Sequence, residues 1–137
     1  MRLSADALNR FGEALGATLS APAVIGLSGD LGSGKTTLAQ AICRGLGAAA
    51  PVSSPTYALV HRHETPTGTP VYHVDCYRLA DPAQARDLGF DDMVREDAIV
   101  LIEWPERAAG WVPPLDRLFH LGYDDDPAMR VLEEASP

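Results

Sequence analysis

The sequence predicts an α/β protein, because segments with the apolar pattern of strands alternate along it with segments that have the pattern of helices. A short apolar run at residues 23–28 is followed by a glycine-rich segment and then by a helical pattern at 36–46. A second run, AIVLIEW at 98–104, is apolar without alternation. That pattern is typical of a central strand that is buried on both faces of a parallel sheet.

The first expected element is an amphipathic helix near the N-terminus. Ser4 is a suitable N-cap residue, and the apolar residues after it recur at helical spacing. These apolar positions are Leu8, Phe11, Leu15 and Leu19. The helix predicted at 36–46 also has one apolar face, and Gly47 is a natural end for it.

The middle of the chain predicts a hairpin followed by short helices. Strand-like segments at 57–64 and 71–77 are separated by TPTGTP, which is turn chemistry. Asp81 then offers an N-cap and Pro82 a first helical residue, so one or two short helices are expected before the strand at 98–104.

The last segment predicts two more strands, at 117–124 and 129–136, on either side of the polar turn DDDP. A chain of 137 residues, 46% of them hydrophobic, can bury one core without disulfides or a structural metal. We therefore expect a single domain over residues 1–137.

The charge and hydropathy of the chain restrict its partners and its location. The formal net charge of −8 disfavours unaided binding to nucleic acid, which needs clustered Lys and Arg. No apolar run approaches the roughly 20 residues of a membrane span, and no secretory signal peptide is visible. We therefore expect a cytoplasmic protein that binds neither membranes nor DNA.

The cysteines and histidines lack the spacing of a metal site. Cys43 and Cys76 form no CxxC motif, so both are expected to be buried free thiols. The histidines are His61, His63, His73 and His120. A surface location is expected for them.

Lys35 is the only lysine, whereas the other ten basic residues are arginines. It lies in GDLGSGKT, residues 29–36, which matches the phosphate-binding loop pattern GxxxxGK[ST]. The loop follows a predicted buried strand and opens a predicted helix, which is the context that the pattern requires.

Each residue type in this loop has a separate physical reason. Gly29, Gly32 and Gly34 permit positive φ and close backbone approach, so that successive N–H groups converge on phosphate oxygens. The helix N-terminus adds unpaired N–H donors. The compact ammonium of Lys35 can reach the outer phosphates, and the Thr36 hydroxyl suits a magnesium ion. The residues expected to bind nucleotide here are Asp30, Leu31, Gly32, Ser33, Gly34, Lys35, Thr36 and Thr37.

Hydrolysis of a nucleotide also needs a carboxylate near the metal. Glu103 follows four apolar residues of the strand at 98–104, where a Walker B acid would lie. Asp75, near the end of the strand at 71–77, is the other candidate, although Arg78 is close enough in sequence for a simple salt bridge. For Glu103 the alternative is a solvated acid at the end of a strand.

The chain resembles the bacterial TsaE (formerly YjeE) ATPases in four segments together. They are GDLGSGKTTLAQAICRGLG, SSPTYALVHRHE, VYHVDCYRLADP and IVLIEWPER, and their spacing also agrees with the family. The resemblance implies a P-loop NTPase-type three-layer fold, with a mostly parallel sheet and antiparallel additions. It also implies ATP and Mg²⁺ as cofactors, a part in making the threonylcarbamoyladenosine (t6A) modification of tRNA, and the TsaB and TsaD subunits as partners. Because the chain is acidic, we expect it to meet tRNA only indirectly.

Carried over by position, the resemblance implies that Lys35 binds phosphate and that Thr36 and Glu103 hold magnesium. Asp75 matches the aspartate of HxDxYR, which implies a part in catalysis or in positioning the metal. The catalytic residues implied are thus Lys35, Asp75 and Glu103, and either carboxylate could orient the attacking water.

The same resemblance implies further contacts. Thr56, in SSPT, would take a switch-like position near the terminal phosphate. Trp104 and Glu106 would flank the nucleotide or a partner surface, with core packing as the alternative for Trp104. Arg130, which follows Met129 where the family has Gly-Arg, would contact the nucleotide.

The leading hypothesis is a magnesium-dependent ATPase that is slow alone, because no arginine is obviously placed as a finger and Arg78 is the best internal candidate. A P-loop small-molecule kinase is the alternative. A nucleotide-binding module without hydrolysis is a further one. A guanine-nucleotide switch is excluded, because Asn9 is the only asparagine, which rules out NKxD, and no DxxG motif occurs.

Overall fold

The computed structural model describes residues 1–48 and 59–137, which form one mixed sheet with helices on both faces. The strands in this part of the chain are β1 (Arg2–Ser4), β2 (Ala23–Gly29), β3 (Val60–Glu64), β4 (Pro70–Asp75), β5 (Ile99–Glu103), β6 (Arg117–Tyr123) and β7 (Met129–Ala135). The α-helices are α1 (Ala5–Thr18), α2 (Lys35–Gly45) and α3 (Phe90–Arg95), and the 3-10 helices are η1 (Pro82–Leu88) and η2 (Pro105–Ala108).

The sheet is parallel in its centre and antiparallel toward its edges. Its strand order is β1-β7-β6-β2-β5-β4-β3. β2 lies between β5 and β6 and is parallel to both, and β4 is parallel to β5. The pairs β3–β4, β6–β7 and β1–β7 are antiparallel. This topology confirms the predicted α/β class with a mostly parallel centre and antiparallel additions.

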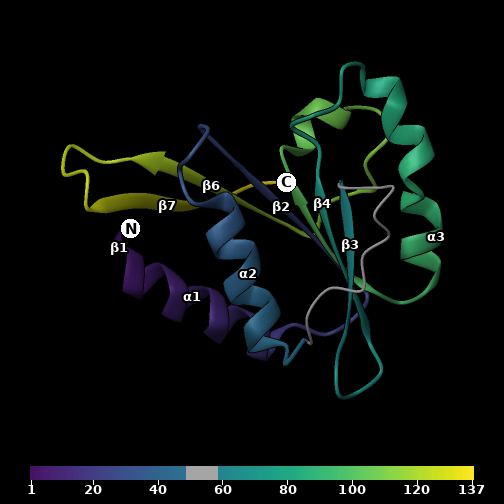
Figure 1. Cartoon of the computed structure of the whole chain (residues 1–137), viewed down its shortest axis with the longest axis horizontal. Helices are drawn as coiled ribbons and strands as arrows, with labels where there is room; N and C mark the ends of the chain where they lie inside the picture. The colour runs from purple at the N-terminus through teal and green to yellow at the C-terminus, as the bar shows by residue number, and fades with distance from the viewer. Residues whose placement is uncertain (49–58) are drawn as a thin grey trace.

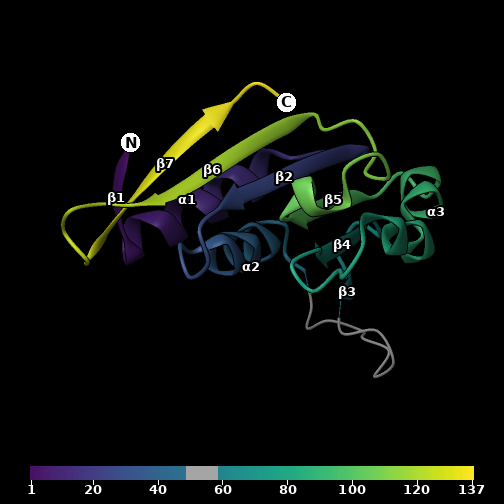
Figure 2. The same cartoon turned by 90° about the horizontal axis from the view of Figure 1, so that it is seen from above.

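Two apolar layers enclose the sheet. On one face α1 and α2 pack against the strands, with Leu38 and Ile42 of α2 buried beside Leu27. On the other face the short helices pack, with Phe90 and Met93 of α3 buried. Figure 1 shows α1 and α2 on one side of the strands and α3 on the other. Figure 2 shows β2, β5 and β4 side by side, and the candidate site lies where these strands end.

α1 and α2 approach closely because glycines replace side chains where the helices meet. A Cβ atom at Gly12 would lie 2.5 Å from the Cβ atom of Ala41. A Cβ atom at Gly16 would overlap the carbonyl oxygen of Ile42. α1 is therefore held directly against α2, the helix that follows the glycine-rich loop.

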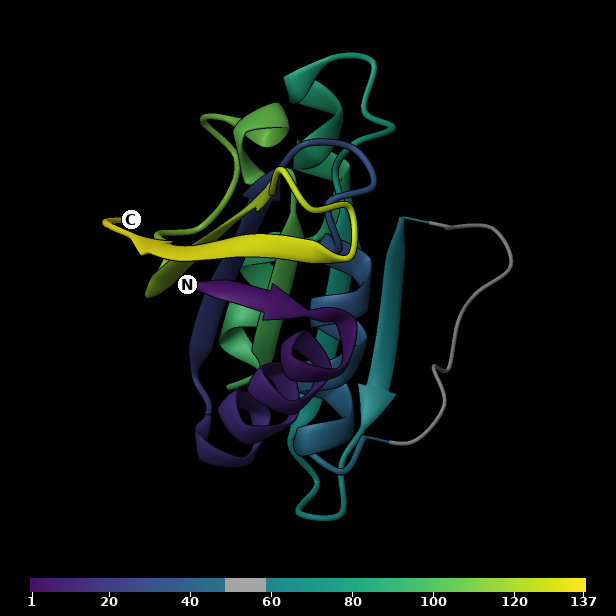
Figure 3. The same ribbon diagram turned by 90° about the vertical axis from the view of Figure 1, so that its left-hand side faces the viewer.

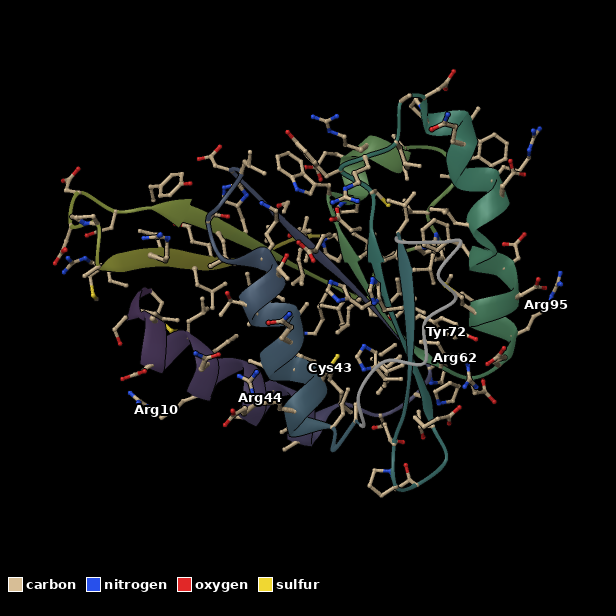
Figure 4. All side chains as sticks on the ribbon, viewed as in Figure 1. Arg10, Cys43, Arg44, Arg62, Tyr72 and Arg95 are labelled. Atoms are coloured by element: carbon tan, nitrogen blue, oxygen red, sulfur yellow. The ribbon has the colours of Figure 1, made fainter. Side chains whose placement is uncertain are left out.

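Both cysteines are buried free thiols, as predicted. Burial raises the pKa of Cys43 to about 11 and that of Cys76 to about 12. Cys43 lies on α2 next to Arg44, whose Nε donates to Glu13 of α1 at 3.0 Å (Figure 4). These thiols belong to the core of the fold.

Several elements differ from those that the sequence predicts. No pattern predicts β1, because three residues are too few to show alternation, and this strand forms by pairing with β7 (Figure 3). The segment after Asp81 begins as the 3-10 helix η1, and Gly89, with φ of 84°, separates it from α3. The strand predicted at 71–77 ends at Asp75 instead. Of the strand predicted at 57–64, residues 57–58 lie outside the described residues.

Within residues 1–48 and 59–137, no helix has both the length and the apolar character needed to cross a bilayer.

Candidate phosphate and metal site

Two glycines shape the loop between β2 and α2. Gly29 ends β2 with φ of 135°, and a side chain there would overlap the backbone of Leu121 on β6. Gly34 precedes α2 with φ of 111°. Residues with a Cβ atom rarely adopt such angles, so both positions require glycine. The chain can thus pass from the end of the central strand directly into the first turn of the helix.

Lys35 is the first residue of α2 and is buried, with only 4% of its surface exposed. Its Nζ donates to the carbonyl oxygens of Gly29 and Asp30, at 2.7 and 2.6 Å. It also lies 3.4 Å from Oγ of Ser33 and 4.3 Å from the centre of the Trp104 ring. The ammonium therefore occupies the middle of the loop, held by carbonyl oxygens and one aromatic face.

The electrostatic surroundings of Lys35 combine burial with negative charge. Burial lowers the pKa of the Lys35 ammonium, and the carboxylates of Glu103, Glu106, Asp30 and Asp75 oppose this shift only in part. Lys35 is therefore a buried cation near several carboxylates. An anion that bound beside it could become its main partner.

Thr36, the next residue of α2, is joined to the end of β5. Its Oγ1 donates to Oε1 and Oε2 of Glu103, at 2.8 and 3.0 Å. Nε2 of His73 lies 2.5 Å from Oε2 of the same carboxylate. Burial by itself raises the pKa of Glu103, but the hydrogen bonds from His73 and Thr36 and the positive charges nearby outweigh it, so the pKa lies below its ordinary value. Glu103 is 3% exposed and is thus a buried, paired acid rather than a solvated one.

Asp75 lies beside Glu103, because the two residues are paired in the register of β4 and β5. Its Oδ1 accepts a hydrogen bond from the backbone N–H of Tyr77 at 3.0 Å. Arg78, which the sequence offers as a salt-bridge partner, faces the same cavity as Asp75, but among the described residues no ion pair joins the two. The parallel strands β4 and β5 thus end in two neighbouring carboxylates.

A cavity of about 220 Å³ opens between the loop, α2 and these strand ends. Its lining residues are Leu31, Gly32, Gly34, Lys35, Thr36, Thr37, Asp75, Tyr77, Glu103 and Trp104. One wall is aromatic, because the rings of Tyr77 and Trp104 lie 5.1 Å apart. Trp104 adopts φ of 57°, an uncommon conformation for a residue with a side chain. Strain of this kind often accompanies a functional site.

A second cavity, of about 520 Å³, shares Thr36, Asp75 and Glu103 with the first. Its other described lining residues are Gln40, His61, His63, His73 and Arg78. The three shared residues therefore stand between the loop cavity and a larger polar space.

Four predicted site residues within the described part of the chain do not line the loop cavity. Asp30 lines a different cavity, and Ser33 is fully buried with its Oγ 3.4 Å from Lys35 Nζ. Glu106 is exposed on η2 and lines a different cavity. Arg130 lies on β7, where its guanidinium donates to backbone oxygens of residues 127 and 129 and stacks 5.0 Å from the Tyr123 ring. Tyr123 in turn donates to the carbonyl oxygen of Leu31 at the loop tip. Thr56 lies outside the described residues.

The structure adds residues that the sequence does not single out. The surface location predicted for His73 is wrong, because its side chain is only 13% exposed and contacts Glu103. His73 and Asp75 are two residues apart on β4 and so point to the same face of the sheet. The spacing of His73 and Asp75 along the predicted strand is the one sequence signal that could have placed His73 at the site. Tyr77 lines the loop cavity because the chain turns after β4. The sequence predicts that this residue still belongs to the strand.

The donors at the end of β5 fit a hard divalent cation. Thr36, Glu103 and Asp75 offer only oxygen atoms. In the described part of the chain, no group of three His, Cys, Asp or Glu side chains could hold a metal by itself. Mg²⁺ usually keeps several waters and binds through one or two carboxylates plus substrate phosphates, so this donor set suits it.

A parallel strand, a glycine-rich loop and a helix that begins at a buried lysine define the class of α/β proteins with a GxxxxGK[ST] loop. A family model described as threonylcarbamoyl adenosine biosynthesis protein TsaE matches residues 3–131. The chain belongs to the TsaE family.

The relatives named tRNA threonylcarbamoyladenosine biosynthesis protein TsaE include those of Haemophilus influenzae and of a Nostoc species. The protein of Haemophilus influenzae is 45% identical over 100 residues, which cover 73% of this chain and 63% of that protein. The protein of a Nostoc species is 43% identical over 97 residues, covering 68% of this chain and 59% of that protein. The chain thus spans less than two thirds of the length of each relative.

The fold has a counterpart among solved structures. The crystal structure of YdiB from Bacillus subtilis superposes with a TM-score of 0.76 at 23% identity, covering 98% of this chain and 83% of that one. This likeness supports the assignment of the fold.

Proposed function

We propose that this protein is the ATP-binding and ATP-hydrolysing component of the bacterial machinery that makes t6A in tRNA, acting with a transferase of the TsaB–TsaD type. The buried Lys35 supports the nucleotide part most directly. Its ammonium is 2.7 Å from Gly29 O and 2.6 Å from Asp30 O, in the space where a phosphate would lie. Membership of the TsaE family supports the part in t6A synthesis.

The residues of the loop cavity would bind the phosphates of ATP. Residues 34–37, at the start of α2, line the cavity, and the unpaired N–H groups of a helix N-terminus favour an anion there. Lys35 would exchange its carbonyl partners for phosphate oxygens, which carry a full negative charge and accept stronger hydrogen bonds. The cavity of about 220 Å³ has room for phosphates but not for a whole nucleotide, so the nucleoside would lie outside it.

Mg²⁺, when bound, would neutralise charge on the outer phosphates. Thr36 and Glu103 would hold it, and Asp75 lies close enough in the strand register to contribute. The buried Glu103 is held in its ionised form by His73 and Thr36, which suits a metal ligand. Asp75 is paired only through its Oδ1 in the described residues, so its other oxygen is available to orient the attacking water.

We expect the protein to hydrolyse ATP slowly without its partners. No arginine of the described residues lines the loop cavity, and Arg78 faces the second cavity. Catalysis of phosphoryl transfer commonly needs a cation that stabilises the charge of the transition state. A partner that supplies or positions such a group would raise the rate. With a net charge of −8, the chain would meet tRNA through that partner.

The test measures ATP binding calorimetrically with Mg²⁺ present, for the wild-type protein and Lys35→Ala. We expect the variant to bind ATP more weakly by about 1.5–3 kcal/mol, the range for a lost charge-assisted hydrogen bond. A parallel pull-down with the transferase subunits, with and without ATP, tests the partner. Unchanged ATP affinity in Lys35→Ala would refute the phosphate site, and absence of any complex would refute the partner.

A small-molecule kinase is a second candidate, because the cavity of about 520 Å³ beside Thr36 and Glu103 could hold a phosphate acceptor. ATP consumption that depends on an added small metabolite, and not on the transferase subunits, would favour the kinase.

A further inference from the structure

A third cavity, which we call the apolar pocket, lies on the sheet face that carries the short helices. Its volume is about 510 Å³, within the range of pockets that bind ligands. Its lining comes from the end of β2, from β6, from η2 and from the segment between η2 and β6. β2 and β6 lie side by side in Figure 2. Its apolar lining residues are Trp104, Pro105, Ala109, Val112, Leu115 and Leu118. The side chains proposed to hold phosphate and magnesium, those of Lys35, Thr36, Glu103 and Asp75, line the loop cavity and not this pocket.

The pocket is formed by residues that are already fixed in place. Leu115 and Leu118 close over β2 because Gly26 has no side chain, and a Cβ atom there would lie 2.8 and 3.0 Å from their Cδ1 atoms. Asp116 between them is anchored to Val24, whose N–H donates to Asp116 Oδ2 at 2.7 Å. The Asp116 N–H donates back to the Val24 oxygen at 2.8 Å. A partner would therefore meet a preformed pocket, which reduces the cost of binding.

The two residues with a formal charge that line the pocket are acidic. Asp30 and Glu106 both line it and are exposed, and none of the described lining residues is Lys or Arg. The chain as a whole has a net charge of −8. Complementary potentials guide association, so a positively charged partner is favoured at this surface.

The pocket is continuous with the phosphate site. Trp104 lines both cavities, and its ring also faces the Lys35 ammonium. Asp30 lines the apolar pocket with its side chain exposed, while its carbonyl oxygen accepts from Lys35. A molecule bound in the pocket would therefore touch the same loop that we propose binds phosphate.

We propose that the apolar pocket docks a basic segment of a protein partner, which inserts a large apolar side chain into it. Such anchors in buried pockets commonly provide most of the binding free energy of an interface. Lys or Arg residues next to the anchor would face Asp30 and Glu106. This inference rests on the proposed function, because the partner we assign to the pocket is the transferase.

The test uses the same substitution at two exposed alanines. Ala109 lines the pocket and is exposed, so Ala109→Arg would fill the opening and reduce its negative charge. Ala14 is exposed on α1, the helix on the opposite face, so Ala14→Arg adds the same group away from the pocket. Ala109→Glu fills the opening but keeps its charge negative. Each protein is titrated against the purified TsaB–TsaD type complex at low and high salt.

We expect Ala109→Arg to bind the complex at least about 10-fold more weakly than wild type, as for loss of an interface anchor. Ala109→Glu should bind between the two, wild-type binding should weaken with salt, and Ala14→Arg should match wild type. Melting temperature and ATP affinity should be unchanged in all three variants. Wild-type affinity in Ala109→Arg, or an equal loss in Ala14→Arg, would overturn the docking site.

The failure of this inference differs from that of the proposed function. A wild-type protein that binds ATP but not the complex would refute the proposed partner, and the docking site with it. If wild type binds the complex and Ala109→Arg binds it equally well, the docking site alone would be refuted. Equal losses in the Arg and Glu variants would refute the basic character of the partner.

Discussion

The ammonium of Lys35 lies within 2.7 Å of two loop carbonyls while only 4% of the residue is exposed. A guanidinium is wide and planar, so it could not make both contacts in the same space. The other ten basic residues of the chain are arginines, and most of those with described partners lie at the surface, where the fork of the guanidinium is no obstacle. The local geometry of the loop thus accounts for the single lysine.

At the same scale we predict a positioning role for His73. Its Nε2 is 2.5 Å from Glu103, so His73→Asn should free that carboxylate to turn away from Thr36. Groups that orient metal ligands typically contribute about 10- to 100-fold to metal affinity. We therefore expect His73→Asn to need about tenfold more Mg²⁺ for half-maximal ATP hydrolysis, as measured by magnesium titration at saturating ATP.

The longer side chain of His73→Gln provides the control, because its amide can still reach Glu103 and should restore part of the magnesium affinity. ATP affinity measured without Mg²⁺ should be the same in all three proteins. If His73→Asn weakened that metal-free affinity as much as it raised the magnesium requirement, the side chain would be supporting the loop and not the acid.

The sequence predicts some residues of the site better than others, for a physical reason. Lys35 and Thr36 belong to one contiguous loop, and Glu103 ends an apolar strand, so local pattern suffices to identify each of them. His73 reaches Glu103 only through the parallel register of β4 and β5. Register between strands depends on tertiary packing, which local spacing does not encode.

At the scale of elements, the crossing of α1 and α2 depends on glycine. A Cβ atom at Gly16 would overlap Ile42 O, and the neighbouring Gly45 Cα would be 3.1 Å away. Backbone atoms cannot move aside as a flexible side chain can, so Gly16→Ala should force the helices apart. Overpacking of this kind costs about 1–3 kcal/mol. We expect the free energy of unfolding in urea to fall by that amount.

The matched control is Gly122→Ala on β6, where an added Cβ atom would meet nothing within 4 Å. Replacement of Gly by Ala at a compatible site restricts the unfolded chain and commonly stabilises a protein by about 0.4–1 kcal/mol. Replacing Gly by Ala should therefore lower the free energy of unfolding at position 16 and raise it at position 122. Equal effects would mean that helix propensity or chain entropy, not the helix contact, determines the result at Gly16.

The elements that the sequence predicts well are those whose own residues supply the signal. α1 begins at Ala5 after the cap at Ser4, whose Oγ accepts from the N–H of Ala7 at 3.1 Å. The pattern also predicts β2, α2 and β5 at nearly their observed bounds. β1 has no such signal, because it exists only through its pairing with β7 at the far end of the chain.

At the scale of the whole molecule, the Lys35 ammonium links the loop cavity to the apolar pocket. Lys35 holds the carbonyl oxygen of Asp30 and faces the ring of Trp104. Both of these residues also line the apolar pocket. A phosphate that withdrew the ammonium from them would alter the walls of the pocket without touching its interior.

We therefore predict that ATP and the docked partner influence each other's affinity. Coupling free energies of this kind are typically about 1–3 kcal/mol, so the affinity for the transferase complex should differ by about 5- to 150-fold between the ATP-bound and ATP-free protein. Linkage requires that the complex change the affinity for ATP by the same factor, and titrating each ligand in the presence of the other measures both. Lys35→Ala has no ammonium that ATP could withdraw from Asp30 and Trp104. At saturating ATP the coupling free energy of this variant should therefore fall toward zero, even though the variant still binds the complex. If wild type and Lys35→Ala showed the same coupling factor, the signal would have to pass between the cavities by a route other than this cation.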